Sequence, residues 1–191
     1  MMSRPGARLG LCVVAGSVPT AIIGLALKDV FEQLFSHPTA VGVAFGVTGL
    51  VLLATRWAPK PLPVAEGGAM SVWKALVVGT VQGLAITPGI SRSGSTIAAA
   101  MFLGVDRELA ARFSFLLSVP AIGGAFLLSL RKLEPADMDF LPLAVGFVVA
   151  AISGWGALLV LLRLVRTGDF SRFAWYLLPL SVFALWSGMA V

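Results

Sequence analysis

The residues best suited to chemistry lie together in one short polar segment between two apolar ones. Residues 88–96 read Pro-Gly-Ile-Ser-Arg-Ser-Gly-Ser-Thr and combine four hydroxyl side chains with Arg92, the one charge placed within an apolar stretch. A guanidinium at the depth of a lipid bilayer costs about 2.5–3.5 kcal/mol on insertion scales, so such a residue is usually paired or functional. The segment therefore predicts that Arg92 binds an anion.

The same segment offers further donors to an anion. Residues 94–96 are expected to open a helix, whose first backbone N–H groups and positive dipole end favour a phosphate-like ligand. The planar fork of Arg92 matches phosphate oxygens. Additional hydroxyl donors come from Ser91, Ser93, Ser95 and Thr96. Alternatively, Ser95 or Thr96 is only an N-cap and the serines satisfy backbone groups of a buried turn, which explains the hydroxyls but not the arginine.

The composition gives the class of protein that must position this segment. The 191 residues are 58% hydrophobic and 12% charged, with a mean hydropathy of +0.96, which is far more apolar than a soluble domain. The net charge of +5 is interpreted as a record of membrane topology rather than of nucleic-acid binding. The single cysteine, Cys12, excludes a disulfide framework and a cysteine metal site.

The apolar segments predict an all-α polytopic membrane protein with one integral domain over residues 1–191. Five segments are long enough to cross a membrane, namely residues 9–27, 39–55, 113–130, 140–162 and 173–190. Residues 72–87 and 94–105 are shorter and flank the polar turn. We expect them to form a re-entrant hairpin rather than one broken span, because irregular backbone is tolerated only where protein or a wet cavity surrounds it. Two spans in residues 1–57 thus precede a hairpin in 72–105, and three spans follow in 113–190.

The distribution of positive charge predicts the orientation. Of the fourteen Lys and Arg residues, ten fall on the side of the N-terminus, three on the opposite side, and Arg92 lies in the turn. Under the positive-inside rule, the N-terminus is cytoplasmic.

The motif around Arg92 also resembles that of a known family. Residues 82–85, Gln-Gly-Leu-Ala, and then residues 88–96 resemble the second signature of the undecaprenyl-diphosphate phosphatase family of the bacitracin-resistance type. The similarity continues through residues 113–115 and 119–120 to 173–176. The resemblance implies a multi-pass hydrolase of the bacterial plasma membrane that removes the terminal phosphate of a polyprenyl diphosphate, the lipid carrier of wall synthesis, at a site open to the outer face.

The resemblance further assigns roles to residues of the motif. Arg92 would clamp the diphosphate and act with Ser91 as a catalytic residue. The substrate site would comprise Gln82, Pro88, Gly89, Ser91, Arg92, Ser93, Gly94, Ser95 and Thr96. A divalent cation, magnesium or calcium, would bridge the diphosphate and the glutamates of the family's first signature.

The sequence departs from that family in its first half. The family is built from two inverted repeats, each a re-entrant hairpin followed by three spans, and its first signature holds two glutamates, a serine pair and a histidine. Here two spans precede the hairpin, and no Glu-x-x-x-Glu occurs. We therefore expect a hairpin and one span, roughly 80 residues at ordinary lengths, to be absent, and the metal ligands with them. Either the start codon is set too late, or the gene is truncated, or a second polypeptide supplies them, and the chain alone is expected to be inactive. A homo-oligomer is a separate alternative for its assembly.

No other residue offers a clear replacement for the missing acid–base chemistry. His37 lies in a loop predicted on the outer side, and Asp106 and Glu108 are expected to begin the next helix. A serine nucleophile needs a base, and none is evident beside Ser91 or Ser93. The alternative class is therefore a non-enzymatic polyprenyl-phosphate-binding protein or a transporter of the lipid carrier, which would use the same anion site.

Overall fold

Every regular element of the described chain is a helix. The computed structural model describes residues 5–61, 69–131, 140–167 and 170–189. The α-helices are α1 (Pro5–Ala26), α2 (Lys28–Phe35), α3 (Pro38–Ala54), α4 (Val72–Leu84), α5 (Arg92–Phe102), α6 (Arg107–Leu130), α7 (Phe140–Thr167) and α8 (Phe173–Met189), and the short 3₁₀ helices are η1 (Thr55–Trp57) and η4 (Phe170–Arg172). Within these ranges, α1, α3 extended by η1, α6 and α7 are long and apolar enough to cross a membrane, and α4 and α8 are shorter apolar helices. The prediction of an all-helical polytopic membrane protein is confirmed.

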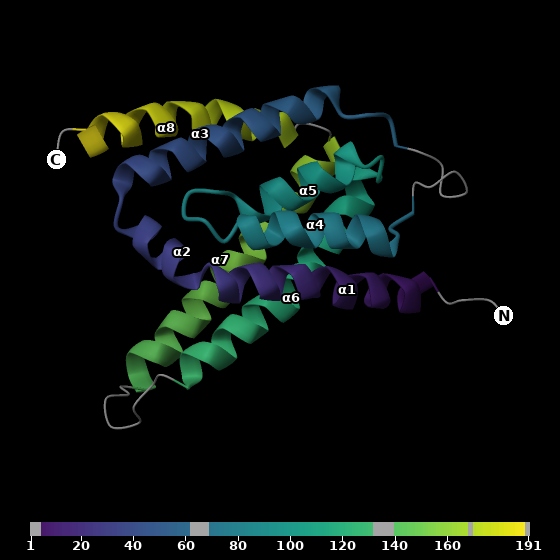
Figure 1. Cartoon of the computed structure of the whole chain (residues 1–191), viewed down its shortest axis with the longest axis horizontal. Helices are drawn as coiled ribbons and strands as arrows, with labels where there is room; N and C mark the ends of the chain where they lie inside the picture. Colours follow the sequence, from purple (N-terminus) through teal and green to yellow (C-terminus); the bar gives the residue numbers. More distant parts are fainter. Residues whose placement is uncertain (1–4, 62–68, 132–139, 168–169, 190–191) are drawn as a thin grey trace.

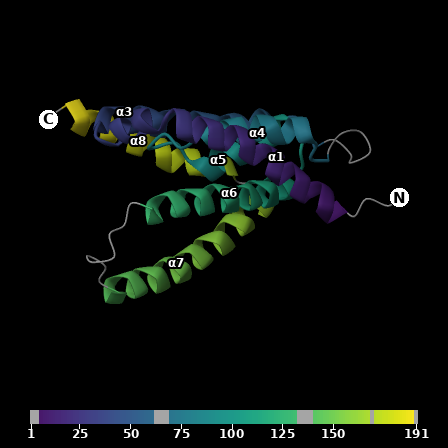
Figure 2. The same cartoon turned by 60° about the horizontal axis from the view of Figure 1, so that its bottom comes forward.

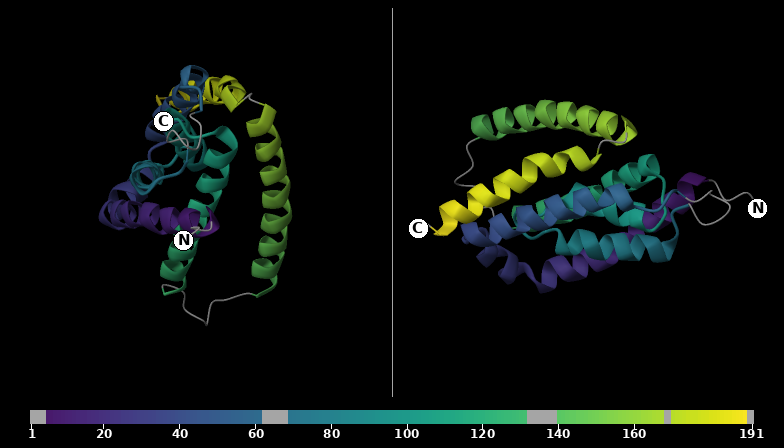
Figure 3. Two further views of the ribbon diagram at one scale, coloured as in Figure 1. Left: turned by 90° about the vertical axis from the view of Figure 1, so that its right-hand side faces the viewer. Right: turned by 90° about the horizontal axis from the view of Figure 1, so that it is seen from above.

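The helical hairpin α4–α5 lies in the middle of the molecule. It is flanked by α1 on one side and by the paired helices α3 and α8 on the other (Figure 1). The start of α4 and the end of α5 lie on the same side as the start of α1, and the connecting turn points the opposite way. Helices α6 and α7 form an arm on one face of this body. Helix α7 begins apart from α6 and approaches it towards its C-terminal end (Figures 2 and 3).

Small residues allow α1 and α4 to approach closely. A Cβ atom added to Gly79 would lie 1.9 Å from the carbonyl oxygen of Gly16, and one added to Gly16 would lie 2.8 Å from that of Ala75. The Thr20 hydroxyl donates to the Gly79 carbonyl at 2.8 Å. Because lipid tails are as apolar as leucine, helices in a membrane associate through such close contacts and interhelical hydrogen bonds. These contacts hold the first arm of the hairpin against α1.

The pairing of α3 with α8 uses the same principle. Glycines of α3 each face a larger side chain of α8, in the pairs Gly42 with Leu185, Gly46 with Ser181, and Gly49 with Leu178. The Ser181 hydroxyl also donates to the Gly42 carbonyl at 2.7 Å. Helix α3 is thereby fixed on one side while its other side faces the hairpin.

Some helix boundaries differ from those expected from the sequence. Helix α6 begins at Arg107, six residues before the predicted span, because Asp106 caps it by accepting hydrogen bonds from the backbone N–H groups of Glu108 and Leu109 at 2.9 and 3.4 Å. The prediction that Asp106 and Glu108 begin a helix is confirmed. Lys74, one of the ten Lys and Arg residues assigned to the side of the N-terminus, lies in the first turn of α4 and is only 6% exposed.

Replacing Gly79 by alanine tests the α1–α4 contact. The new methyl group would overlap the Gly16 backbone, so the helices must separate, and we expect the unfolding free energy to fall by about 1–3 kcal/mol, as for other overpacked sites. The measurement is chemical denaturation of the purified protein in detergent. Gly146→Ala in α7 is the matched control, because a Cβ there meets no atom within 4 Å. Equal stability of the two variants would contradict this packing.

Candidate functional site

The turn between α4 and α5 is shaped by a glycine that no other residue can replace without strain. Gly89 has φ +88°, in the left-handed region that disfavours side chains. An added Cβ would also lie 2.6 Å from the carbonyl oxygen of Val41 and 2.9 Å from the Cβ of Ala44, both in α3. The Pro88-Gly89 pair therefore ends the first arm and lets the turn lie directly against α3.

Ser91 begins the second arm as the N-cap of α5. Its Oγ accepts a hydrogen bond from the backbone N–H of Gly94 at 3.1 Å. The helix consequently begins at Arg92, two residues earlier than expected, and the suggestion that Ser95 or Thr96 is the cap is wrong. The cap leaves the Ser91 hydroxyl proton available for a further acceptor.

A cavity of about 470 Å³ lies beside this turn. Its polar lining residues are Gln82, Thr87, Arg92, Ser93, Ser114 and Ser118. Its apolar lining residues include Phe35, Ile97, Phe115, Ile122, Leu158 and Leu161. The hairpin, α6, the C-terminal part of α7 and the end of α2 thus meet around one space that is lined by both polar and apolar residues.

Arg92 lies on the wall of this cavity without a protein partner among the described residues. It is the first residue of α5, is partly buried, and its guanidinium makes no hydrogen bond or ion pair with the described part of the chain. The positive end of the α5 dipole adds to its charge, and exposed Ser93 lies beside it. This arrangement suits a phosphate-like anion.

Gln82 links three helices and is 1% exposed. Its Nε2 donates to the Leu117 carbonyl of α6 at 3.2 Å and to the Thr20 hydroxyl of α1 at 3.3 Å, while its Oε1 has no partner. The donors of this amide are therefore committed to protein acceptors, and the free atom is an acceptor. Binding of Gln82 to a substrate stays a prediction, but a direct bond to a phosphate oxygen would require it to give up one of these contacts.

The remaining motif residues divide into two groups. Pro88, Gly89, Arg92 and Ser93 line the cavity, as does Gln82. Ser91, Gly94, Ser95 and Thr96 do not line it. Thr96 is fully buried, and its hydroxyl lies 2.5 Å from that of Ser114 in α6 while donating to the Arg92 carbonyl at 2.8 Å. Thr96 therefore ties α5 to α6.

Two cavity residues were missed from the sequence. Ser114 and Ser118 lie in the apolar helix α6, four residues apart and hence on one helical face, and both line the cavity. Only this spacing could have indicated that they share a function, because hydroxyls in membrane helices commonly bond to their own backbone, as Ser118 does to Phe115.

The described residues do not fit the divalent cation implied by the resemblance. No group of three or more His, Cys, Asp or Glu side chains comes together in the described ranges, and the cavity wall carries no carboxylate or imidazole. His37 is exposed at the start of α3 and is not part of that wall. Glu66 lies outside the described residues.

The fold and the site together define a helical membrane protein in which Arg92, without a partner among the described residues, lines a cavity with polar and apolar residues. Residues 1–183 match the family described as bacitracin resistance protein BacA, and the chain belongs to this family. The resemblance found in the motif around Arg92 is thereby confirmed.

Several similar proteins carry the name undecaprenyl-diphosphatase. One from Carboxydothermus hydrogenoformans is 42% identical, over 95% of this chain and 71% of its own length. One from Desulfosudis oleivorans is 49% identical, over 96% of this chain and 67% of its own. One from Methanothermobacter thermautotrophicus is 45% identical, over 91% of this chain and 97% of its own.

The Thr96–Ser114 contact makes a testable contribution to stability. Thr96→Val removes a buried hydroxyl and leaves the Ser114 hydroxyl without this partner, so we expect the unfolding free energy to fall by about 1–3 kcal/mol. A double-mutant cycle with Ser114→Ala, measured by denaturation in detergent, should show a coupling of at least about 0.5 kcal/mol. Thr80→Val is the matched control, because Thr80 is exposed and bonds only within α4. Additive effects at Thr96 and Ser114 would show that the pair is not coupled.

Proposed function

We propose that this protein is an undecaprenyl-diphosphatase, which converts a polyprenyl diphosphate and water into polyprenyl phosphate and inorganic phosphate. This reaction recycles the lipid carrier of bacterial wall synthesis. The observation that carries the proposal is the guanidinium of Arg92, at the start of α5 on the cavity wall with no partner in the described chain. Membership of the BacA family and the names of the relatives support it.

The polar and apolar residues that line the cavity suit the two parts of such a substrate. The diphosphate would lie against Arg92, Ser93 and the first turn of α5. The first part of the polyprenyl chain would lie against Phe115 and Ile122 of α6 and Leu158 of α7. Beyond the cavity, both helices expose apolar side chains over most of their length, so the rest of the chain could remain in lipid.

Hydrolysis at this site requires charge stabilisation above all. A water oxygen bonds to the terminal phosphorus and loses a proton to surrounding water or to a phosphate oxygen. The bond from that phosphorus to the bridging oxygen breaks, and polyprenyl phosphate leaves with the electron pair. Arg92 and the first N–H groups of α5 would hold the phosphate oxygens, where negative charge is spread in the transition state. Ser91 would contribute by fixing that first turn, through its bond with Gly94.

The cavity wall favours a second candidate, binding without hydrolysis. No carboxylate or imidazole lines the described wall, so the group that would take the proton from water, and the ligands of a cation, are not among those residues. A polyprenyl-phosphate-binding protein or transporter would need neither. Acidic groups supplied by another polypeptide would make hydrolysis possible at this site. Binding and phosphate release must therefore be measured separately.

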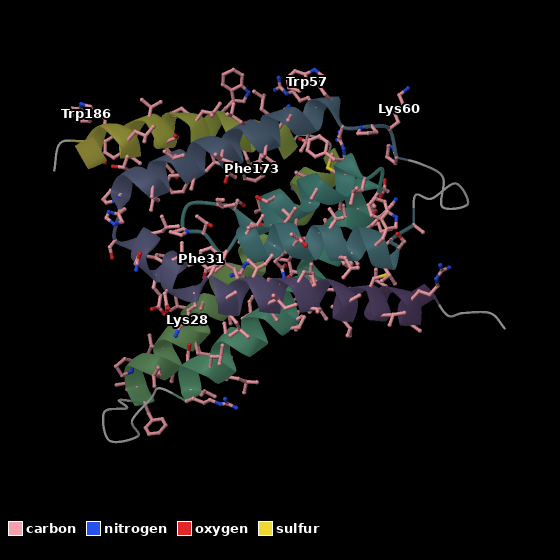
Figure 4. The ribbon with its side chains drawn as sticks, in the orientation of Figure 1. Lys28, Phe31, Trp57, Lys60, Phe173 and Trp186 are labelled. Atoms are coloured by element: carbon pink, nitrogen blue, oxygen red, sulfur yellow. The ribbon has the colours of Figure 1, made fainter. Side chains whose placement is uncertain are left out.

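For the membrane, we propose five spans, with α4–α5 as a re-entrant hairpin in the bacterial plasma membrane. At 1.5 Å per residue, the 13 residues of α4 extend about 20 Å, less than the ~30 Å hydrocarbon layer. Lys60 and Lys28 lie at opposite ends of the helical body (Figure 4). With the N-terminus cytoplasmic, the hairpin would enter from the cytoplasmic face, and the cavity would open towards the outer face.

Cysteine labelling tests the hairpin. In a Cys12→Ser background, Val72→Cys at the start of α4 and Phe102→Cys at the end of α5 should be reached by a membrane-impermeant maleimide from the same side. His37→Cys, in the exposed junction between α2 and α3, is the reference and should be labelled from the other side. Labelling of positions 72 and 102 from opposite sides would show that the hairpin spans the membrane.

Arg92→Lys tests the anion clamp. Lysine keeps the charge but cannot make the two-pronged contact, and each lost charge-assisted hydrogen bond is worth about 1.5–3 kcal/mol. We expect the Kd for a polyprenyl diphosphate in detergent to rise at least tenfold in calorimetric titration. Arg112→Lys is the matched control, because Arg112 is exposed, paired with Glu108 and absent from the cavity wall. An unchanged Kd for Arg92→Lys would remove Arg92 from the binding site.

Phosphate release tests the reaction itself. The purified chain is assayed with a polyprenyl diphosphate and magnesium or calcium, beside Arg92→Ala and Arg112→Ala. Because the described lining carries no base and no cation ligand, we expect the chain alone to release little phosphate. That residual release should fall at least about a hundredfold in Arg92→Ala and little in Arg112→Ala, since removal of a charge-stabilising donor has an effect of this order. Binding without release by the unmodified chain would instead favour the second candidate. If the unmodified chain shows no binding and no phosphate release, both proposed functions are refuted.

A further inference from the structure

A threonine of α3 holds the backbone immediately before Arg92. Thr48 is 1% exposed, and its Oγ1 accepts a hydrogen bond from the backbone N–H of Ser91 at 3.1 Å. The two residues are 43 positions apart in the chain. Ser91 precedes the first helical residue, so its N–H is outside the regular hydrogen bonds of α5 and needs a partner from elsewhere.

The geometry of the Thr48 hydroxyl suits this role. A hydroxyl has one proton to donate, and the nearest carbonyl is that of Ala44, one helical turn earlier, at 3.0 Å. The Gly89 carbonyl of the turn is farther away, at 3.4 Å. With its proton committed to a carbonyl, the oxygen is left as an acceptor for the Ser91 N–H. Valine has the same shape but could neither donate to the Ala44 carbonyl nor accept a hydrogen bond from the Ser91 N–H.

The rest of the same α3 face is fitted to the turn. The Val41 carbonyl and the Ala44 methyl group lie where a side chain of Gly89 would be, so the turn is in close contact with α3 there as well. Val41, Ala44 and Thr48 follow the i, i+3, i+7 spacing of one helical face. Helix α3 is in turn fixed to α8 by the Ser181–Gly42 hydrogen bond. The turn is therefore positioned by contacts with α3, a helix in the first half of the chain.

We propose that Thr48 is a positioning residue for the anion site. By holding the Ser91 N–H, it fixes the residue that both caps α5 and precedes Arg92, and so it sets where the guanidinium and the first N–H groups of α5 meet the ligand. The inference rests on the proposed function only for the identity of that ligand, a polyprenyl diphosphate. The support of the turn by α3 is independent of the reaction.

The first test measures backbone amide exchange of the protein in detergent, resolved over the turn. In the unmodified protein the Ser91 amide should be protected, and in Thr48→Val its exchange should accelerate at least tenfold. Thr48→Ser keeps the hydroxyl and should stay within about threefold. Thr80→Val, which removes an exposed hydroxyl of α4, should not alter this amide. A Ser91 amide without protection in the unmodified protein would overturn the proposal whether or not the variants fold.

The second test measures affinity for a polyprenyl diphosphate in the folded fraction of each variant. Thr48→Val should raise the Kd at least tenfold, with Thr48→Ser close to the unmodified protein. If Thr48 only stabilises the fold, Thr48→Val should lower the denaturation midpoint and leave the Kd of the folded protein unchanged. That result would overturn the proposal. If the unmodified protein does not bind the lipid, the proposed function fails, and the exchange experiment alone decides the role of Thr48.

Discussion

The need to satisfy backbone polar groups away from water governs this structure. An apolar helix meets that need by itself, but the turn between α4 and α5 cannot, because its residues leave the helical hydrogen-bond pattern. The turn finds partners locally, as in the bond from the Ile90 N–H to the Thr87 carbonyl at 3.1 Å, and remotely, in the bond from the Ser91 N–H to Thr48. The neighbouring helices are arranged so that the remote partners are within reach.

Close helix packing provides that arrangement. Gly16 and Gly79 bring α1 against the first arm of the hairpin, and Gly42 brings α8 against α3. Larger residues at these points would move the helices apart, and hydrogen bonds that connect them, such as those of Thr20 and Ser181, would be lost. In a membrane, where burial of apolar surface between helices adds little, these short contacts determine where the hairpin sits.

The site combines one charge with an apolar neighbourhood. Arg92 lies at the N-terminal end of a short helix, so its charge and the helix dipole act on the same region. Phe115 of α6 and Leu158 of α7 line the same cavity. This combination suits an amphiphilic ligand with an anionic head, and it arises because residues of the hairpin turn line the same cavity as α6 and α7, two helices with many exposed apolar side chains.

The sequence alone determined the class and the motif. Long apolar runs can be satisfied in a membrane only as helices, and the Pro-Gly break with Arg92 marks a turn that needs an anion and a protein surround. Local chemistry also predicted that Asp106 begins a helix. Each of these features depends on residues that are close together in the chain, so each can be predicted from the sequence.

Only the tertiary structure decided the partners of individual polar side chains. Thr96 carries a hydroxyl of the kind expected at an anion site, yet it bonds Ser114 of another helix, and the donors of Gln82 are taken by α1 and α6. Thr48 lies within an apolar span, and no sequence pattern indicated that it contacts the turn. Which groups face the cavity depends on how each helix is rotated against its neighbours, and that rotation is set by contacts between residues far apart in the chain, which no local pattern encodes.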